Sequence, residues 1–191
     1  MGELTSGKRP VLISFFTYTG IALITVLSAW MINLHRFDLS LTISRYVALR
    51  PWTAIVYGLC IVFMVTLIFV FLKKTKMLLL RKIIYSLVFI CVLGCGIFPF
   101  NRTWSNLVST LHNYSAYALM LLVTISFIVL VITGRKAQKI FAVLSILYAV
   151  YFIISFVVFD WQWFNNTIFI WENLFIYLLL GELWLEKTDN N

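Results

Sequence analysis

The chain has 191 residues, of which 62% are apolar or aromatic and only 12% are charged. An ordinary soluble domain carries roughly 25% charged residues, so this composition excludes a water-soluble globular protein. The formal net charge of +8 would suggest a nucleic-acid partner if the chain were soluble. The positions of the basic residues explain that charge instead, and we expect no nucleic-acid partner.

Six apolar stretches have the length and composition of membrane-spanning helices. About 20 residues rising 1.5 Å each cover the roughly 30 Å hydrocarbon core, and a helix satisfies its own backbone polar groups. In chain order the expected spans cover residues 11–34, 52–72, 83–99, 111–133, 140–159 and 164–185. The sequence therefore predicts one all-α domain over residues 1–191, a polytopic integral membrane protein with six transmembrane helices in a single bundle.

The basic residues fall mainly in alternate gaps between these spans. Eleven lie before the first span, after the second and fourth, or in the tail: Lys8, Arg9, Lys73, Lys74, Lys76, Arg81, Lys82, Arg135, Lys136, Lys139 and Lys187. Four lie on the opposite side: Arg36, Arg45, Arg50 and Arg102. Because cytoplasmic loops carry the excess of Lys and Arg, both termini are expected in the cytoplasm. The first span is longer than a signal-peptide core, which favours a retained anchor.

The first outer gap, residues 33–51, alternates polar and apolar residues from Asp38 to Ser44. Alternation is typical of an extended segment on a protein surface, although Asp38 could equally cap a short interfacial helix with Leu41 and Tyr46 on its apolar side. Either form is expected to lie against the bundle. Two interpretations stay open, a solvated connector and a lid over a cavity.

The third span ends in a cluster of helix-modifying residues. Gly94 and Gly96 permit close helix approach, and Pro99 predicts that the helix kinks or ends early. Ser109 and His112 follow at a spacing of three, on one helical face entering the fourth span. A polar face is costly toward lipid, so it should turn into the bundle.

Glu172 is the most costly residue of the sixth span. A carboxylate about two turns below the outer boundary must find a partner, reach water through the bundle, or keep its proton. Candidate partners are His112 and Arg102, and then Arg36, Arg45 and Arg50. Structural pairing that fixes helix register and ligand or proton binding both remain open. By contrast, Glu182 and Glu186 near the cytoplasmic end are expected to be interfacial or solvated.

Metal and cofactor chemistry finds little support among the titratable residues. Cys60, Cys91 and Cys95 lie inside spans in no zinc or disulfide pattern, and we expect them to act as small apolar fillers. His35 and His112 could in principle ligate a haem, but hydrogen bonding explains outer-end histidines better. We therefore expect no metal and no cofactor.

The segment 40–54 followed by an apolar helix, and Gly96-Ile97-Phe98-Pro99 with His112 downstream, carry a family resemblance. They are similar to the two signature regions of the bacterial membrane family catalogued as domain of unknown function 998, and distantly to the DRAM/Frag/Sfk group. The chain has Arg45 where that family usually has an acidic residue, and Phe100-Asn101 where an Asp often follows Phe-Pro. The resemblance implies a six-span fold in the cell membrane with an outward-facing pocket.

These observations favour a non-enzymatic multi-pass protein that binds or senses a lipid, peptide or small amphiphile in a polar vestibule at its outer side. His112, Glu172, Ser109, Arg36, Arg45 and Arg102 are the candidate ligand-binding residues. Basic cytoplasmic gaps suit anionic lipid or a soluble regulator, and a regulatory or immunity role and an oligomer are compatible with them. The alternatives are a small proton-coupled secondary transporter and a membrane-embedded lipid hydrolase built on Ser109, His112 and Glu172.

Overall fold

The structure is a computed structural model that describes residues 7–32, 43–48, 51–98, 106–158 and 168–186. Every element of secondary structure within these ranges is an α-helix. Their bounds are α1 Arg9–Ile32, α2 Ile43–Val47, α3 Pro51–Lys74, α4 Leu79–Ile97, α5 Asn106–Thr133, α6 Lys136–Val158 and α8 Ile168–Trp184. The prediction of an all-helical chain is therefore confirmed for the described residues.

Each predicted span corresponds to one of the long helices. The largest difference is at the start of α5, which begins at Asn106, and the starts of α4, α6 and α8 each differ by one residue less. The described part contains three helices that are long and apolar enough to cross a membrane, α3, α4 and α5. Shorter apolar helical stretches cover Arg9–Ile24 and Asn173–Trp184. The chain thus has the helices of a membrane protein.

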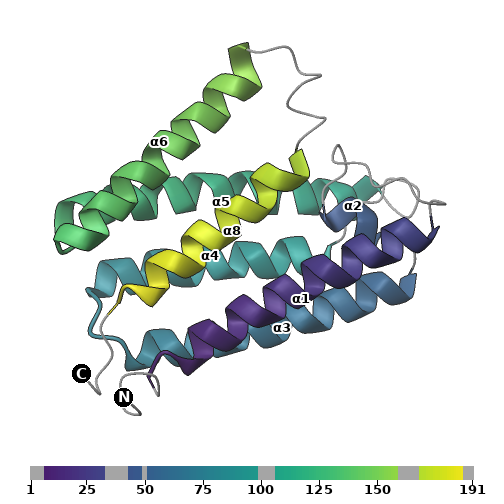
Figure 1. The fold of residues 1–191 in the computed structure, drawn as a ribbon, viewed down its shortest axis with the longest axis horizontal. Coiled ribbons are helices and arrows are strands. Elements are labelled where there is room, and N and C mark those ends of the chain that lie inside the picture. Colours follow the sequence, from purple (N-terminus) through teal and green to yellow (C-terminus); the bar gives the residue numbers. More distant parts are fainter. Residues whose placement is uncertain (1–6, 33–42, 49–50, 99–105, 159–167, 187–191) are drawn as a thin grey trace.

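The long helices form a closed ring in which each one packs on the next. The order of contact is α1, α3, α4, α5, α6 and α8, and α8 returns to pack on α1 (Figure 1). Helix α1 begins and α8 ends at the same end of the bundle, where α3 also meets α4 and α5 meets α6. We call this the basic end, because Lys8, Arg9, Lys73, Lys74 and Arg135 lie there. The opposite end, which holds α2, is called the α2 end.

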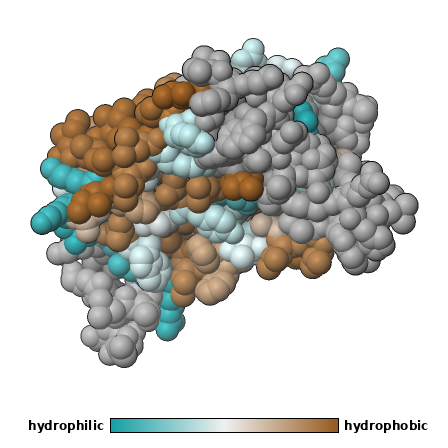
Figure 2. All heavy atoms as spheres, turned by 45° about the horizontal axis from the view of Figure 1, so that its top comes forward, coloured by the Kyte–Doolittle hydropathy of each residue, from teal (hydrophilic) through white to brown (hydrophobic). Residues whose placement is uncertain are grey.

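The bundle is apolar on the outside as well as inside. Met64, Ile68 and Phe127 are fully buried, whereas Leu79 and Ile132 are 73% and 71% exposed on the outer surface. Figure 2 shows a broad hydrophobic face with hydrophilic residues gathered at one edge, toward the basic end. Soluble monomers rarely expose such continuous apolar surface, so the outer face of the bundle suits contact with lipid.

Two glycines of α4 set its distance from its neighbours. A β-carbon added at Gly96 would lie 2.6 Å from Ile61 Cγ2 of α3, and one added at Gly94 would collide with Ser115 of α5. The helix then ends at Ile97, two residues before Pro99, as the proline predicts. The sequence-based expectation of close packing and early termination in this segment is confirmed.

Aromatic contacts close the ring between the first and last helices. The Tyr177 ring of α8 lies 5.3 Å from that of Phe15 and 5.4 Å from that of Tyr18, measured between centroids. The hydroxyl oxygens of Thr19 and Tyr177 are 3.2 Å apart, within hydrogen-bond distance. Lipid tails are as apolar as leucine, so such specific contacts hold membrane helices together more than burial alone does.

Replacement of Gly96 by alanine tests the α3–α4 contact. The added methyl group has no room against Ile61, so Gly96→Ala should lower the free energy of unfolding by about 1–3 kcal/mol. Gly20→Ala is the matched control, because a β-carbon there meets nothing within 4 Å. Thermal unfolding in detergent should show a lower midpoint temperature for Gly96→Ala and an unchanged midpoint for Gly20→Ala. Combining Gly96→Ala with Ile61→Val should recover part of the lost midpoint temperature. Equal midpoints for the two glycine variants would contradict the packing.

Candidate functional site

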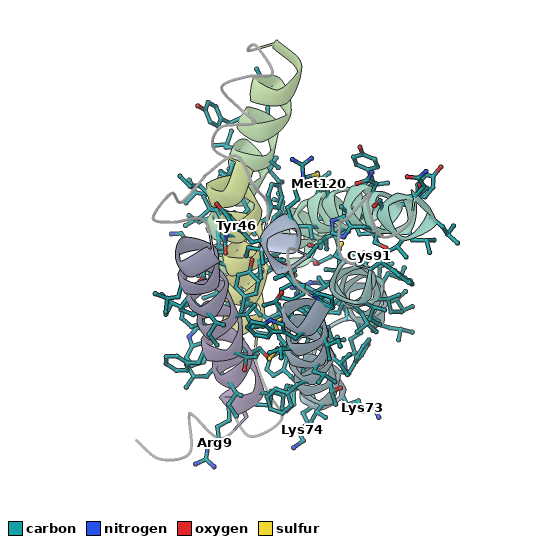
Figure 3. The ribbon with its side chains drawn as sticks, turned by 90° about the vertical axis from the view of Figure 1, so that its right-hand side faces the viewer. Arg9, Tyr46, Lys73, Lys74, Cys91 and Met120 are labelled. Atoms are coloured by element: carbon teal, nitrogen blue, oxygen red, sulfur yellow. The ribbon has the colours of Figure 1, made fainter. Side chains whose placement is uncertain are left out.

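Helix α2 is seated among the ends of the long helices and packs on α1 and α3. Its apolar residues Ile43, Tyr46 and Val47 are buried, while Arg45 is exposed. The Thr53 hydroxyl at the start of α3 donates a hydrogen bond to the Val47 carbonyl, which fixes α2 to α3. Figure 3 looks onto this end and shows α2 and the labelled Tyr46 within the ring of helices. The expectation that this segment lies against the bundle is confirmed.

Ser109 and His112 face inward from the first turns of α5, as their spacing predicts. They are 3% and 7% exposed. His112 Nδ1 lies 2.7 Å from the Phe98 carbonyl oxygen, which the end of α4 leaves available. A carbonyl can only accept, so Nδ1 carries a proton in this contact. The early end of α4 therefore supplies an acceptor that orients the His112 ring.

The Ser109 hydroxyl has no hydrogen-bond partner among the described residues. A buried polar group without a partner costs about 1–3 kcal/mol, so such groups usually have a reason to persist. The hydroxyl makes no hydrogen bond to His112, so the serine–histidine contact on which a hydrolase would depend is not formed in this structure. What remains is an inward-facing donor and acceptor, one helical turn from a buried imidazole.

The other predicted site residues divide between this end and positions outside the description. Arg45 of α2 is within electrostatic reach of His112 of α5, at the same end of the bundle. Arg36 and Arg102 lie outside the described residues. Glu172 lies in α8, as predicted for the sixth span, but its side chain is also outside the described part. The contact predicted between Glu172 and His112 therefore stays a prediction.

A shallow pocket lies beside α2, between α1 and α3. Its empty volume, open side included, is about 410 Å³. The lining residues are Ile21, Ile24, Tyr46, Val47, Trp52, Thr53, Val56, Tyr57 and Cys60. Tyr46 and Val47 belong to α2 and follow Arg45 directly, so α2 joins the basic residue to the apolar pocket.

The basic end holds a second polar cluster, centred on Arg81 in the first turn of α4. Arg81 is only 5% exposed, and its Nη2 atom donates a hydrogen bond to Glu186 Oε1. The same atom lies 3.5 Å from Glu182 Oε1 in α8. Glu182 is 0% exposed and Glu186 is 6% exposed. The expectation that these two glutamates are solvated or interfacial is wrong, because α8 and the turn that follows it direct the carboxylates of Glu182 and Glu186 toward Arg81.

Residues that follow α5 complete this cluster. Gln138 Nε2 donates to Glu186 Oε1 at 2.6 Å, and Gln138 Oε1 accepts from the Arg135 backbone N–H at 2.9 Å. Arg135 Nη2 donates to the Leu185 carbonyl at 2.6 Å, which satisfies an orphan acceptor at the end of α8. The Arg81 cluster therefore ties α4 and the start of α6 to the end of α8.

The Arg81 cluster does not satisfy every buried polar atom. Arg81 Nε, Tyr85 Oη and Glu182 Oε1 lack a hydrogen bond among the described residues. Ser126 Oγ lies 3.5 Å from Glu182 Oε2, so α5 also touches the cluster. Two carboxylates face the Arg81 guanidinium, and Arg135 lies beside them at the end of α8. The cluster therefore pairs charge inside the bundle.

Sequence reasoning missed this cluster, although one signal for it was present. Glu182 and Glu186 are four residues apart and so share a helical face at the end of an apolar helix. Arg81 was assigned to the loop before the third span, whereas α4 begins two residues before it. The pairing joins residues 105 positions apart, which helical periodicity does not reveal.

The described residues contain no group of three or more His, Cys, Asp or Glu side chains placed to hold a metal ion. The three cysteines are free thiols, each half-buried within its helix. Neither polar cluster has the donor set of a metal centre: one is a serine with a histidine, and the other pairs its carboxylates with arginine.

Removal of Arg81 tests whether the cluster holds the basic end together. Arg81→Met leaves two buried carboxylates without their cation and should lower the free energy of unfolding by about 3–5 kcal/mol. Lys74→Met is the matched control, since Lys74 is exposed at the same end. Adding Glu182→Gln and Glu186→Gln to Arg81→Met should recover much of the loss, as no charge then stays buried. Denaturation in mixed micelles measures the stability of the wild type, of Arg81→Met, of Lys74→Met and of the triple variant. Arg81→Met as stable as Lys74→Met would contradict the pairing.

Comparison of the chain with protein-family models, with curated proteins and with solved structures finds no significant match. The resemblance to the family catalogued as domain of unknown function 998 is therefore neither confirmed nor contradicted.

Proposed function

We propose that this chain is a six-span protein of the cell membrane, with both termini cytoplasmic, that binds an amphiphile with an anionic headgroup at its outer, α2 end. The observation that carries the proposal is the buried hydroxyl of Ser109, which has no hydrogen-bond partner in the described part of the chain and lies one turn from His112. A buried donor and acceptor kept without a protein partner suits hydrogen bonding to a ligand.

The surroundings of Ser109 favour an amphiphile as that ligand. Arg45 supplies exposed positive charge at the same end and lies within electrostatic reach of His112. The pocket beside α2 supplies apolar lining from Trp52 and Val56, both open to the bilayer side. In our proposal the headgroup lies near Arg45, His112 and Ser109 and the tail lies in the pocket. This is the lid interpretation of the segment that contains α2.

The topology in this proposal rests on charge and helix placement. Helix α1 begins and α8 ends at the basic end, so an even number of spans connects them. Lys and Arg are concentrated at that end, and the positive-inside bias favours placing it in the cytoplasm. The resemblance to the domain of unknown function 998 family is consistent with the same six-span arrangement.

Ser109→Ala separates a ligand-binding role from a structural one. The hydroxyl makes no hydrogen bond to any described residue, so the ligand-free variant should unfold at the same temperature as the wild type or higher. Binding of lysophosphatidylglycerol, followed by native mass spectrometry, should weaken up to about tenfold in Ser109→Ala. Arg45→Gln should remove the preference for lysophosphatidylglycerol over lysophosphatidylcholine.

Thr110→Ala is the matched control for Ser109→Ala. Thr110 is the next residue of α5, it is exposed, and its hydroxyl donates to the Asn106 carbonyl of its own helix. It should bind the lysolipid like the wild type. Lower stability of Ser109→Ala with unchanged lysolipid binding would show that the serine is structural and would contradict the proposal.

Transport is the second candidate function, and the Arg81 cluster is the observation that favours it. A polar lock at the basic end, opposite a ligand site at the α2 end, is what one state of an alternating-access cycle requires. The buried carboxylate of Glu182 would then carry the proton, a role that the sequence assigned to Glu172.

Accessibility from the basic end distinguishes transport from binding. With the three native cysteines replaced by alanine, Val88→Cys places a thiol at a fully buried position of α4, about two turns above Arg81. In a transporter, a membrane-impermeant maleimide added at the basic end should label this thiol, and the labelling should be faster when Glu182→Gln is also present. In a binding protein the thiol should stay unlabelled with or without Glu182→Gln.

A further inference from the structure

A second apolar groove lies at the other end of the molecule, on the outer surface between α1 and α8. Its empty volume, open side included, is about 570 Å³. The lining residues are Val11, Leu12, Phe15, Tyr177, Leu180, Gly181 and Trp184. They come from the first turns of α1 and the last turns of α8, so the groove opens at the basic end.

Different chemistry bounds the two ends of this α1–α8 groove. Toward the middle of the bundle, the Phe15 and Tyr177 rings close it, with centroids 5.3 Å apart. At the basic end, Lys8 Nζ lies 5.3 Å from the centre of the Trp184 ring. Arg9 follows Lys8 and is exposed, and Figure 3 shows it pointing away from the bundle. An apolar slot therefore runs from an aromatic stop to a pair of cations.

We propose that the α1–α8 groove binds an anionic glycerophospholipid, with one acyl chain in the slot and the phosphate against Lys8 and Arg9. A phosphate accepts charge-assisted hydrogen bonds from both cations. The first turn of α1 contains no acidic residue that would neutralise them. Polybasic segments at a membrane surface attract anionic lipid in this way. In this proposal the Trp184 indole lies at the membrane–water interface, where tryptophan is enriched.

The dimensions of the groove favour a lipid over a partner helix. Its α8 side runs from Tyr177 to Trp184, which is roughly 10 Å of helix at 1.5 Å per residue. That length takes part of an acyl chain but seats only two turns of a helix. Lys8 Nζ lies over the Trp184 ring, so a positive charge stands directly beside the apolar lining at the basic end of the groove.

Photocrosslinking in nanodiscs tests the proposal and locates the lipid. The full-length protein is reconstituted in phosphatidylcholine containing either phosphatidylglycerol or phosphatidylcholine with a diazirine in the acyl chain, and labelled peptides are mapped by mass spectrometry. The phosphatidylglycerol probe should label the peptides that contain Phe15 and Tyr177 preferentially. In the Lys8→Gln/Arg9→Gln variant, the ratio of labelling by the phosphatidylglycerol probe to labelling by the phosphatidylcholine probe should fall roughly tenfold. Leu12→Trp should reduce labelling by both probes, because its side chain fills the slot.

The matched control is Lys73→Gln/Lys74→Gln, which removes two exposed charges from the same end of the bundle on α3. It should leave labelling in the α1–α8 groove unchanged. Equal labelling by the two probes, or an equal loss in both double variants, would overturn the proposal, because the lipid would then respond to surface charge in general. Loss of folding in Leu12→Trp is checked by the unfolding temperature, and the charge variants decide the question independently. Binding at the α2 end is read separately, through Arg45→Gln, so either proposal can fail alone.

Discussion

The basic end of this bundle depends on one interaction, the ion pairing of the Arg81 guanidinium with the carboxylates of Glu182 and Glu186. In contact with lipid, a helix gains little from burying more apolar surface, so association rests on close packing and on polar groups satisfied inside the protein. The Arg81 cluster involves α4, α5, α6 and the end of α8. A buried ion pair contributes less through its own energy than through the cost of separating its members. That cost favours one arrangement of these helices over others.

The two ends of the bundle solve the same problem in opposite ways. At the basic end, charge is paired internally, a glutamine donates a second hydrogen bond to Glu186, and a second arginine satisfies the Leu185 carbonyl. At the α2 end, a short helix fills the ring with apolar side chains, Arg45 is exposed, and Ser109 has no hydrogen-bond partner within the described ranges. The first end is suited to holding helices together. The second combines a buried hydroxyl that has no partner among the described residues with adjacent apolar lining, which suits a ligand site.

Lipid contact extends this contrast to the outer surface. The formal net charge of +8 is concentrated where headgroups of the cytoplasmic leaflet would lie in the proposed topology. The α1–α8 groove adds a shaped apolar surface beside two of those charges. The aromatic contacts that close the ring also form the inner stop of that groove. The aromatic contact between α1 and α8 therefore both closes the helix ring and bounds the groove in which we propose that lipid binds.

Sequence alone determined the helices and much of their local behaviour. Apolar length locates a span because hydrocarbon has no water to satisfy a broken backbone, and Pro99 ends α4 because it cannot continue the ladder. The inward face of Ser109 and His112 followed from helical spacing. Only the tertiary structure decided that Arg81 and Glu186, 105 positions apart, meet inside the bundle. Spacing along a helix gives the face on which a charge lies, but not the neighbour it meets, and at a span end the same charge could equally have been solvated.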